Sequence, residues 1–583
     1  MQLVTFKKNL IRVDKSNKRF ILKKNFLLGE FQTTASNIYE MGNENIVKCK
    51  LHQKSYDIKY VVRIYEIILN NLSLSLNTIH KKKNTKKYWE LLIGRWTWTY
   101  VFYLISRWNI VSSIEKNNQI DSALVINFNS AHFLPSTTLH FHNMVFNDEN
   151  WNSWTFQEIM KYKKKFRLIY FNLKKKNTKV TANKSDEKIL YYKIYNFFLG
   201  PRNFFFYKFL LPKKIKKIFF LSKFYFILKQ YKNIKKSKYN THYKKIDRNK
   251  FYNFKETKDN FLNFANIFVK KNLPKIFLED YNSLENSYHD LNWPKKPKYI
   301  LTSFGHIYDE TFKIYAAEKR KNNNTKLIIM QHGGSYGMEN KHPGTIFETK
   351  VSDRFLTWGW KNNKKHYPLF NSTIKSQENN FQFKNENKIL LVLYEFNLIP
   401  TRPDNANYTS FNFIKMYVES IVDFIEKLDN KLKTKIVANI KKSGNFKKNF
   451  IKNSILFKHP NLKFVENSKY SHETRSKYNL QVELYFSTGF LEAMSLNNPV
   501  ILICANSFKD QTKQVVKQIQ ILKKRNICFD SSQKASEFIN NNYNSLEEWW
   551  KNPLLQKSRI QFCKKYCKTS KTPIKDLNKS LIF

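Results

Sequence analysis

The sequence predicts an α/β protein with two Rossmann-like domains that face each other across a cleft. Two apolar runs bounded by polar residues, at 327–330 and 388–394, are typical of strands buried on both faces of a parallel sheet. Segments with helical periodicity alternate with such runs. Glycine-rich or hydroxyl-rich loops come directly after strands, which is where ligands bind in open α/β sheets.

The first domain is expected at residues 1–365 and includes a helical segment at 57–110. Residues 57–80 place apolar side chains at helical spacing, and the tryptophan-rich residues 88–108 also have a helical pattern. Residues 121–127 are predicted to form a strand. A chain of 583 residues is too long for one core, so more than one domain is expected.

A βαβ unit is predicted from residue 298. Strand 298–302, helix 309–321 and strand 327–330 follow one another, and a closing strand is expected at 351–358. Parallel strands place their carboxyl-end loops on the same edge of a sheet. We therefore expect Ser303 and His306 to lie near the loop that follows residue 330.

The second domain is expected at residues 387–583, after a polar linker at 366–386 that has no periodicity. Its best-defined part is 479–504, which shows a strand, a Ser-Thr-Gly loop, a helix, an Asn-Pro break and another strand. The tail from residue 547 has the pattern of an amphipathic helix that packs back across the domains.

The formal net charge of +58 would ordinarily point to nucleic acid or an anionic membrane. Residues with A/T-rich codons are abundant and those with G/C-rich codons are scarce, which accounts for much of the lysine excess. No RNA-binding or helix-turn-helix signature is present, so nucleic acid is the less favoured partner. The basic, aromatic-rich residues 160–260 are interpreted either as ordinary scaffold or as a face for peripheral contact with an anionic membrane.

Five cysteines form no CxxC pair, which is typical of reduced thiols in the cytoplasm. The first residues lack the apolar core of a signal peptide, and no run of eighteen uncharged apolar residues occurs. A cytoplasmic protein is expected, with the inner face of the membrane as a peripheral location.

The loop at 331–337, QHGGSYG, is the first candidate site. Its glycines allow close approach of a ligand to the backbone. His332 is the leading candidate for a general base because imidazole titrates near neutral pH. The rival bases are Glu348 and His306, and in the alternative hypothesis His332 only binds a phosphate or holds the loop.

The same loop matches the G-x-S-x-G elbow of hydrolases at residues 333–337. That elbow runs straight into a helix. Pro343 and Gly344 are expected to break any helix here, so the hydrolase interpretation is disfavoured.

Ser487, Thr488 and Gly489 open the second candidate site, at the start of a helix that follows a strand. Free N–H groups and the helix dipole favour a phosphate there, and Glu492 is placed to accept hydrogen bonds from a ribose. The alternative is that Ser487 or Thr488 only caps the helix.

No Asp-x-Asp occurs in the chain, and His306, His332 and His342 lack the i, i+4 spacing of metal ligands. We expect no metal and no cofactor. Helix termini and basic side chains would stabilise the negative charge of a leaving diphosphate.

The motifs QHGG-x-YG and SDRFLTWGW, with weaker matches over nearly the whole chain, resemble a bacterial family of surface-polysaccharide transferases. The resemblance implies a GT-B layout, with an acceptor domain first and a nucleotide-sugar donor domain second. It also implies functional roles for two groups of residues: His332, Gly333, Gly334, Tyr336, Gly337, Glu348, Asp353 and Arg354 in the first domain, and Ser487, Thr488 and Glu492 in the second.

One departure from that family lies at residues 436–446, IVANIKKSGNF, where the family has an arginine followed by Tyr-Pro. Lys441 or Lys442 could supply the positive charge there. A lysine lacks the bidentate fork of arginine, so either donor binding is altered or activity is impaired.

The leading hypothesis is a metal-independent glycosyltransferase that moves a sugar or related unit from a nucleotide-sugar donor to a glycan or lipid-linked precursor of a surface polysaccharide. The nucleotide sugar is a substrate in this scheme. The alternatives are a nucleotide-sugar epimerase and a non-catalytic protein that binds the membrane surface through its basic region.

Overall fold

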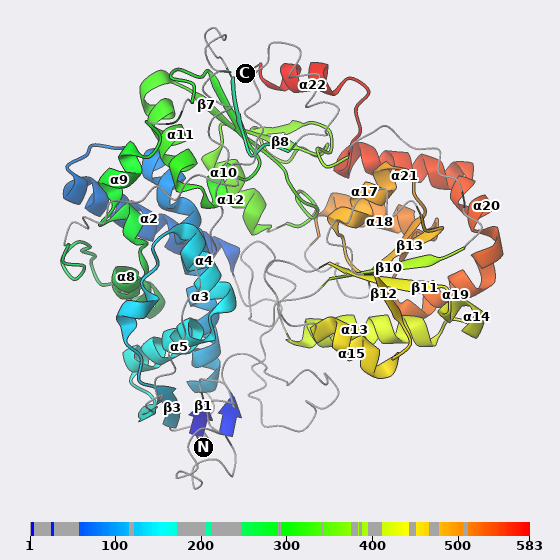
Figure 1. Ribbon diagram of the computed structural model, residues 1–583, viewed down its shortest axis with the longest axis horizontal. Helices are drawn as coiled ribbons and strands as arrows, with labels where there is room; N and C mark the ends of the chain where they lie inside the picture. The colour runs from blue at the N-terminus through cyan, green and yellow to red at the C-terminus, as the bar shows by residue number, and fades with distance from the viewer. Residues whose placement is uncertain are drawn as a thin grey trace.

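The structure is a computed structural model, and it describes most of the chain in two lobes (Figure 1). The described residues are 2–4, 25–27, 57–115, 122–171, 204–210, 246–289, 291, 293–340, 342–374, 383, 387–394, 411–441, 450–465, 477–504 and 511–582.

The first lobe is built on a five-stranded parallel sheet of order β5-β6-β7-β8-β9. All four residues of β6 and four of the five in β7 are buried, as expected for strands covered on both faces. The predicted strands at 298–302 and 327–330 are therefore confirmed. The five strands are Phe204–Tyr207, Tyr299–Thr302, Lys326–Met330, Arg354–Thr357 and His366–Pro368.

Three helices connect these strands near the site. The short α10 (Gly305–Tyr308) and α11 (Glu310–Asn323) join β6 to β7, and α12 (Pro343–Val351) joins β7 to β8. The prediction that Pro343 and Gly344 break any helix is wrong. Proline at the first helical position sacrifices no hydrogen bond, and the His342 side chain caps this helix through the backbone N–H of Thr345.

The linker expected at 366–386 begins later than predicted. Residues 366–368 form the edge strand β9, which pairs with β8, and Leu369 and Phe370 are buried in the core of the first sheet. A three-residue strand is too short to show the alternation that a sequence pattern needs.

Part of the basic, aromatic-rich region is scaffold. Phe205, Phe206 and Tyr207 are buried in β5, the other edge strand of the same sheet. The lysine-rich centre of this region, at 213–225, lies outside the described residues, and so does the membrane contact that it suggested.

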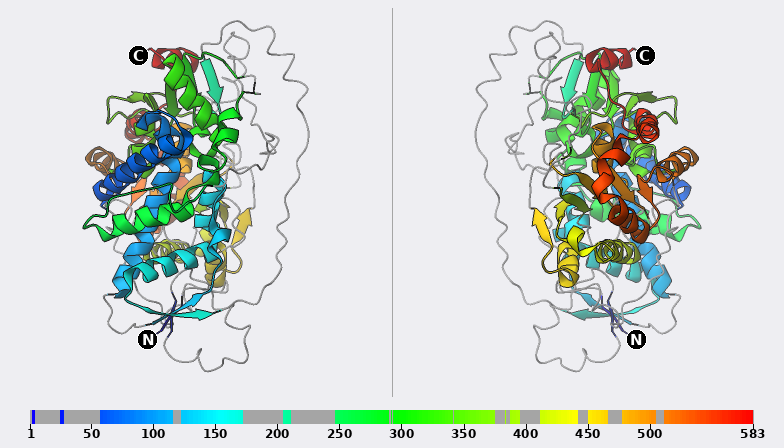
Figure 2. Two further views of the ribbon diagram at one scale, coloured as in Figure 1. Left: turned by 90° about the vertical axis from the view of Figure 1, so that its left-hand side faces the viewer. Right: turned by 90° about the vertical axis from the view of Figure 1, so that its right-hand side faces the viewer.

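The predicted helical segment is confirmed as α2 (Ile58–His80) and α3 (Lys86–Glu115), which pack against each other with Tyr65 on Trp98 at 5.1 Å between ring centroids. The strand predicted at 121–127 is β3, in a separate four-stranded parallel sheet of order β2-β1-β3-β4. This sheet lies at the opposite end of the molecule from the C-terminal helix (Figures 1 and 2). Its strands are Gln2–Val4, Asn25–Leu27, Ser122–Ile126 and Arg167–Phe171.

Further helices of the first lobe surround α3 and the βαβ unit (Figure 1). They are α4 (Thr138–Asn147), α5 (Glu149–Lys163), α8 (Asn260–Asn272) and α9 (Tyr281–Asn286), with short 3₁₀ turns at Ser130–Phe133 and Lys275–Phe277.

The second lobe contains a six-stranded parallel sheet of order β12-β11-β10-β13-β14-β15. In chain order this is 3-2-1-4-5-6, the order of the Rossmann fold, with its switch point between β10 and β13. The prediction of a second Rossmann-like domain is confirmed. The strands are β10 (Ile389–Tyr394), β11 (Ile436–Lys441), β12 (Lys463–Val465), β13 (Leu480–Glu483), β14 (Val500–Ile503) and β15 (Cys528–Phe529).

The end of the chain crosses back to the first lobe, as the amphipathic tail predicted. Leu577 and Leu581, in and just after α22, pack with Ile328 and Met330 on the first sheet. The helices of the second lobe and the tail are α13 (Phe411–Glu426), α14 (Asn430–Lys433), α15 (Phe450–Lys458), α17 (Thr488–Ser495), α18 (Lys513–Lys523), α19 (Ser532–Asn542), α20 (Leu546–Lys551), α21 (Pro553–Tyr566) and α22 (Pro573–Ser580), with a 3₁₀ turn at Tyr543–Ser545.

One apolar core joins the two lobes. Phe347 and Trp360 of the first lobe belong to the same buried cluster as Phe490 and Phe562 of the second. Cysteines 504, 528, 563 and 567 are buried and are not in disulfide bonds. Among the described residues, no helix combines the length and the apolar character needed to cross a membrane.

Candidate active site

The loop after β7 is anchored by Gln331, the first residue of the QHGG motif. Its side-chain oxygen accepts hydrogen bonds from the backbone N–H of Trp358 at 2.9 Å and from the indole N–H of Trp360 at 2.8 Å. Its amide nitrogen donates to the carbonyl of Gly333 at 2.8 Å. Gln331 therefore connects the glycine loop to the WGW segment.

His332 is held by two neighbours on one side of its ring. Its Nε2 lies 3.1 Å from Oε1 of Glu348 and 3.0 Å from the hydroxyl of Tyr336. The Tyr336 hydroxyl also donates to the same Glu348 oxygen at 2.9 Å. Since Glu348 can only accept when ionised, Nε2 carries the proton. Nδ1 is then the basic nitrogen, and it has no hydrogen-bond partner within the described residues.

Glu348 is buried on α12 and does not meet solvent. Burial by itself raises the pKa of this carboxyl, but the interactions with His332 and His306 outweigh burial and hold the pKa well below its usual range. The group is therefore an anion at neutral pH. A buried, weakly basic carboxylate is better suited to orient His332 than to take a proton from a substrate.

His306 faces the same carboxylate from α10, with Nε2 at 3.7 Å from Glu348 Oε1. The ring is fully buried, and neither nitrogen has a hydrogen-bond partner in the part of the chain that the structure describes. Burial lowers the pKa of His306, and the neighbouring Glu348 opposes that shift. The rival base of the sequence interpretation thus lies behind Glu348, away from any substrate at His332.

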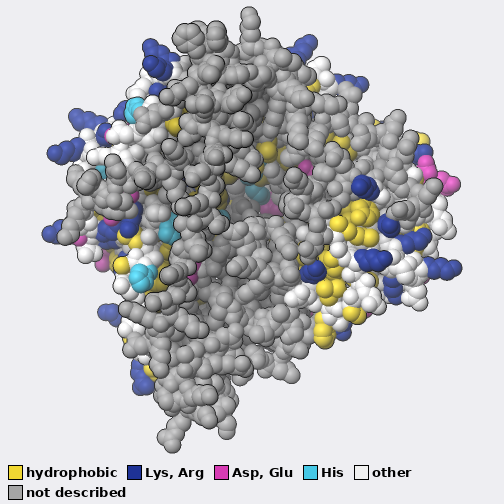
Figure 3. All heavy atoms as spheres, viewed as in Figure 1, with side chains coloured by type: hydrophobic (Ala, Val, Ile, Leu, Met, Phe, Trp, Pro, Cys, Tyr) yellow, Lys and Arg dark blue, Asp and Glu magenta, His cyan; other side chains and the backbone are white. Residues whose placement is uncertain are grey.

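The βαβ prediction placed the loops after β6 and β7 at one edge, and the structure confirms this. Phe304, after β6, lies against His332, with 4.6 Å between ring centroids. Histidine and acidic side chains are visible near the middle of this face of the molecule (Figure 3).

Two positions of the loop require glycine, because neighbouring atoms leave no room for a Cβ. A Cβ on Gly334 would lie 2.9 Å from the backbone nitrogen of Thr488, and a Cβ on Gly337 would lie 2.1 Å from the Trp360 ring. Gly337 also has φ +71°, a conformation that favours glycine. Gly333 has no such constraint, because the nearest atoms to its Cβ position are 3.9 Å away.

The second candidate loop is in direct contact with the first. The backbone N–H of Gly334 donates to Oγ1 of Thr488 at 2.9 Å, and the hydroxyl of Ser335 donates to the carbonyl of Phe486 at 3.2 Å. The backbone of Gly334 therefore covers the N-terminus of α17, where the sequence predicted a phosphate.

Ser487 has two partners within its own lobe. Its hydroxyl accepts from the N–H of Phe490 at 2.9 Å as the N-cap of α17, and it donates to Oε2 of Glu483 at 2.9 Å. Glu483 is fully buried at the carboxyl end of β13, next to the switch point. Sequence reasoning missed Glu483. An acidic residue at the end of a buried strand was the available signal.

The remaining predicted residues of the second lobe lie near the same sheet edge. Gly489 is buried in the first turn of α17, and Glu492, one turn later, is partly exposed. Lys441 ends β11 opposite Tyr394, which ends β10, so its backbone lies at the carboxyl edge of the sheet. Its side chain and Lys442 lie outside the described residues.

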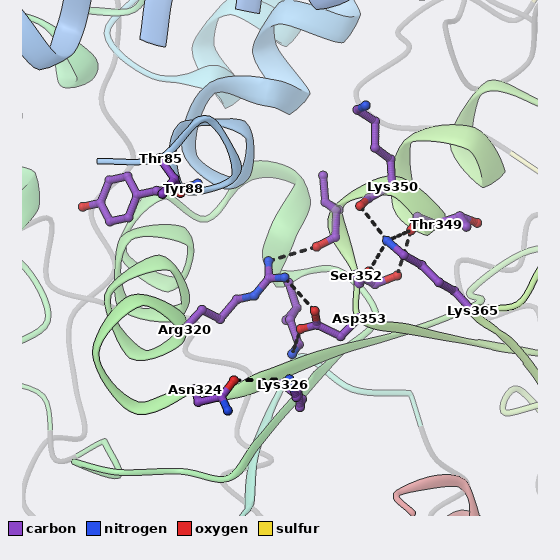
Figure 4. Close-up of polar contacts among 12 residues, drawn as sticks. Thr85, Tyr88, Arg320, Asn324, Lys326, Thr349, Lys350, Ser352, Asp353 and Lys365 are labelled. Carbon is purple, nitrogen blue, oxygen red and sulfur yellow. Dashed lines mark hydrogen bonds and ion pairs between the residues drawn. The ribbon is translucent and has the colours of Figure 1, made fainter. Parts of the chain in front are cut away.

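Asp353 and Arg354, which the family resemblance implied as functional, hold the fold together. Asp353 accepts from Arg320 at 2.9 Å and from the N–H of Leu327 at 2.7 Å (Figure 4). Arg354 donates to the carbonyl of Ser580 at 2.5 Å and so secures α22. The ammonium of Lys365 donates to carbonyls at the end of α12, at 2.7 Å for Ser352 (Figure 4).

Comparison with known proteins gives the family. The family model for LIC12162 family transferase matches residues 13–581. The chain belongs to the LIC12162 family of transferases. This agrees with the transferase family that the motifs resembled. No curated protein matches the sequence.

Solved structures similar to this LIC12162 family member share little sequence with it. MnaA of S. aureus with UDP is 14% identical with a TM-score of 0.32, and covers 50% of this chain and 76% of its own. The wall teichoic acid polymerase TagF is 10% identical with a TM-score of 0.29, over 52% and 86%. MurG of Acinetobacter baumannii is 9% identical with a TM-score of 0.28, over 52% and 79%. The strand orders of this chain carry the fold assignment.

No group of three or more His, Cys, Asp or Glu side chains suited to a metal ion occurs among the described residues. The site as described consists of a histidine oriented by a buried carboxylate and a tyrosine, at the seam between two Rossmann-like sheets.

Proposed function

We propose that this LIC12162 family transferase is a glycosyltransferase that moves a sugar unit from a nucleotide-activated donor to a hydroxyl of a glycan or lipid-linked acceptor. The observation that carries the proposal is the orientation of His332. Glu348 and Tyr336 engage Nε2, which leaves Nδ1 as the proton acceptor at the carboxyl edge of β7. An imidazole held in one orientation with one ring nitrogen left to accept a proton suits a general base.

In the proposed reaction, the acceptor hydroxyl loses its proton to Nδ1 of His332 as its oxygen bonds to the anomeric carbon. The bond between that carbon and the donor phosphate breaks, and the nucleoside diphosphate leaves with the electron pair. Ionised Glu348 stabilises the imidazolium that forms, as a buried carboxylate does beside a catalytic histidine. Tyr336 keeps the ring in position.

The donor is proposed to bind at the carboxyl ends of β10, β11 and β13. The strand order supports this position, since ligands of open α/β sheets bind at the switch point. Lys441 at the end of β11 would pair with the negative charge of the diphosphate, and Glu492 would accept hydrogen bonds from the ribose. Ser487, Thr488 and Gly489 shape this edge from the start of α17. A metal ion is not part of the proposal, because the sequence has no Asp-x-Asp clamp.

The experiment is a panel of nucleotide sugars incubated with the purified full-length chain, with and without glycan acceptors, and analysed for released nucleotide and for changed sugar. A transferase releases nucleoside diphosphate slowly from one donor alone and faster with its acceptor. Conversion of the donor to an epimer without acceptor would contradict the proposal and favour the epimerase. Absence of any turnover or donor binding would favour the non-catalytic alternative.

His332→Ala tests the base. We expect kcat to fall by about 10²–10⁴ with little change in donor affinity. The matched control is His132→Ala, which removes an exposed histidine of the same lobe. A loss of donor affinity with kcat preserved at saturation would show that His332 binds phosphate instead. A fully active variant would rule out both roles.

A further inference from the structure

Phe304 is a large apolar side chain left in contact with solvent beside the proposed base. It is 38% exposed, whereas most phenylalanines of the described core are buried. Its ring lies 4.6 Å from the ring of His332, measured between centroids. An exposed aromatic ring beside His332 is a surface that a substrate can cover.

The backbone fixes where Phe304 stands. It precedes α10 directly, and the next residue, Gly305, donates its N–H to Oγ1 of Thr302 at 2.8 Å. A Cβ on Gly305 would lie 2.8 Å from the Phe312 ring, so α10 packs tightly on the elements behind it. Phe304 is therefore presented by a rigid support.

A half-buried polar pair, Tyr308 and His142, lies at the other end of α10 from Phe304. Tyr308 ends α10, and its hydroxyl lies 2.8 Å from Nδ1 of His142 on α4, with 4.7 Å between the two rings. One turn of helix separates Phe304 from Tyr308, about 6 Å at 1.5 Å per residue. That is about the width of one sugar ring.

We propose that Phe304 is the platform of an acceptor subsite and receives the apolar face of a sugar ring, with the Tyr308–His142 pair meeting the hydroxyls of the next sugar unit. This inference rests on the proposed function. One face of many pyranose rings presents C–H groups, which pack on an aromatic ring while the hydroxyls at the rim remain hydrogen-bonded. A sugar seated on Phe304 would bring its hydroxyl to the neighbouring His332.

The competing occupant is the base of the nucleotide, which also stacks on aromatic rings. The position of Phe304 favours the acceptor. It lies on the edge of the first sheet, at His332, while the switch point that indicates the donor position belongs to the second sheet.

The test uses saturation-transfer NMR on the full-length protein with methyl β-D-glucoside, methyl β-D-galactoside, methyl α-D-mannoside, uridine and cytidine as separate probes. We expect transfer to the C–H protons on one face of at least one glycoside, lost in Phe304→Ala and retained in Phe304→Trp. The control is Phe457→Ala, because Phe457 is 56% exposed in the other lobe. Transfer to the nucleosides that depends on Phe304, or glycoside signals unchanged in Phe304→Ala, would overturn the proposal.

A kinetic arm separates this inference from the proposed function. With an active acceptor, Phe304→Ala should raise the KM for acceptor about tenfold, and the control Phe457→Ala should leave that KM unchanged. If Phe304→Ala still releases nucleotide and its KM for acceptor equals that of the wild type, the subsite is rejected. The transferase proposal then stands. If the wild-type chain turns over no donor, the proposed function fails, and the NMR result alone decides whether Phe304 binds sugar.

Discussion

The backbone N–H of Gly334 and the hydroxyl of Thr488 are 154 residues apart in sequence and form a 2.9 Å hydrogen bond between the two lobes. The bond joins the loop after β7 to the start of α17. The two motifs singled out from the sequence therefore contact each other directly. Their close approach has consequences that substitution can measure.

Gly334→Ala should destabilise the protein by about 1–3 kcal/mol, because overpacking a tight contact forces backbone shifts. The new Cβ would lie 2.9 Å from the backbone nitrogen of Thr488 and 3.0 Å from the carbonyl carbon of Ser487. Urea unfolding of the full chain measures the effect. Gly333→Ala is the matched control, since its Cβ has no atom closer than 3.9 Å. Equal stability of the two variants would contradict the contact.

Ser487→Ala should destabilise the protein more than the loss of an ordinary helix cap does. Loss of a serine N-cap costs about 0.5–2 kcal/mol, and here the buried carboxylate of Glu483 also loses a hydrogen-bond donor. Ser531→Ala is the comparison, because Ser531 caps α19 through the N–H of Lys534 alone. Thermal unfolding of both variants gives the difference. If Ser487→Ala is no more costly than Ser531→Ala, the bond to Glu483 contributes nothing.

Glu348→Gln should lower kcat by about 10²–10⁴ and leave donor affinity in place, because the amide cannot stabilise the imidazolium of His332. The measurement is acceptor-dependent turnover at saturating donor, with unfolding recorded alongside to confirm that the variant folds. Glu256→Gln changes an exposed carboxylate of the same lobe and serves as the control. Unchanged turnover in Glu348→Gln would show that Glu348 has a structural role and none in turnover.

Stability should fall on acidification from about pH 6.5 to about pH 4, and His366 should contribute. Burial lowers the pKa of His366 from 6.5 to about 4. Its Nδ1 accepts from the N–H of Asn362 at 3.2 Å, and its Nε2 contacts the Thr349 hydroxyl at 2.8 Å, which favours the neutral ring. Between these pH values the unfolded chain binds a proton that the folded chain does not, so unfolding is favoured.

Urea unfolding at pH 7, 6 and 5 checks this expectation by comparing wild type with His366→Gln. The slope of stability against pH should be shallower in the variant, and some slope should remain because burial also lowers the pKa of His306. Identical slopes would show that His366 is not protonated on unfolding in this range.

The sequence by itself determined the layers of the fold and which loops come together at the candidate site. Apolar runs such as 327–330 are bounded locally, and the helical spacing of 57–80 is a property of the segment, so both could be predicted without knowledge of their neighbours. The parallel βαβ rule also placed the loops after β6 and β7 together, and Phe304 lies against His332 accordingly.

Only the tertiary structure decided how each residue of the candidate site is placed. Residue type made Glu348 and His306 rival bases, whereas packing buries both behind His332. Thr488 was predicted to bind a phosphate. In the structure its hydroxyl accepts a hydrogen bond from the N–H of Gly334. Burial and contacts between distant segments set the charge, the orientation and the accessibility of a side chain, and periodicity along one segment carries none of this information.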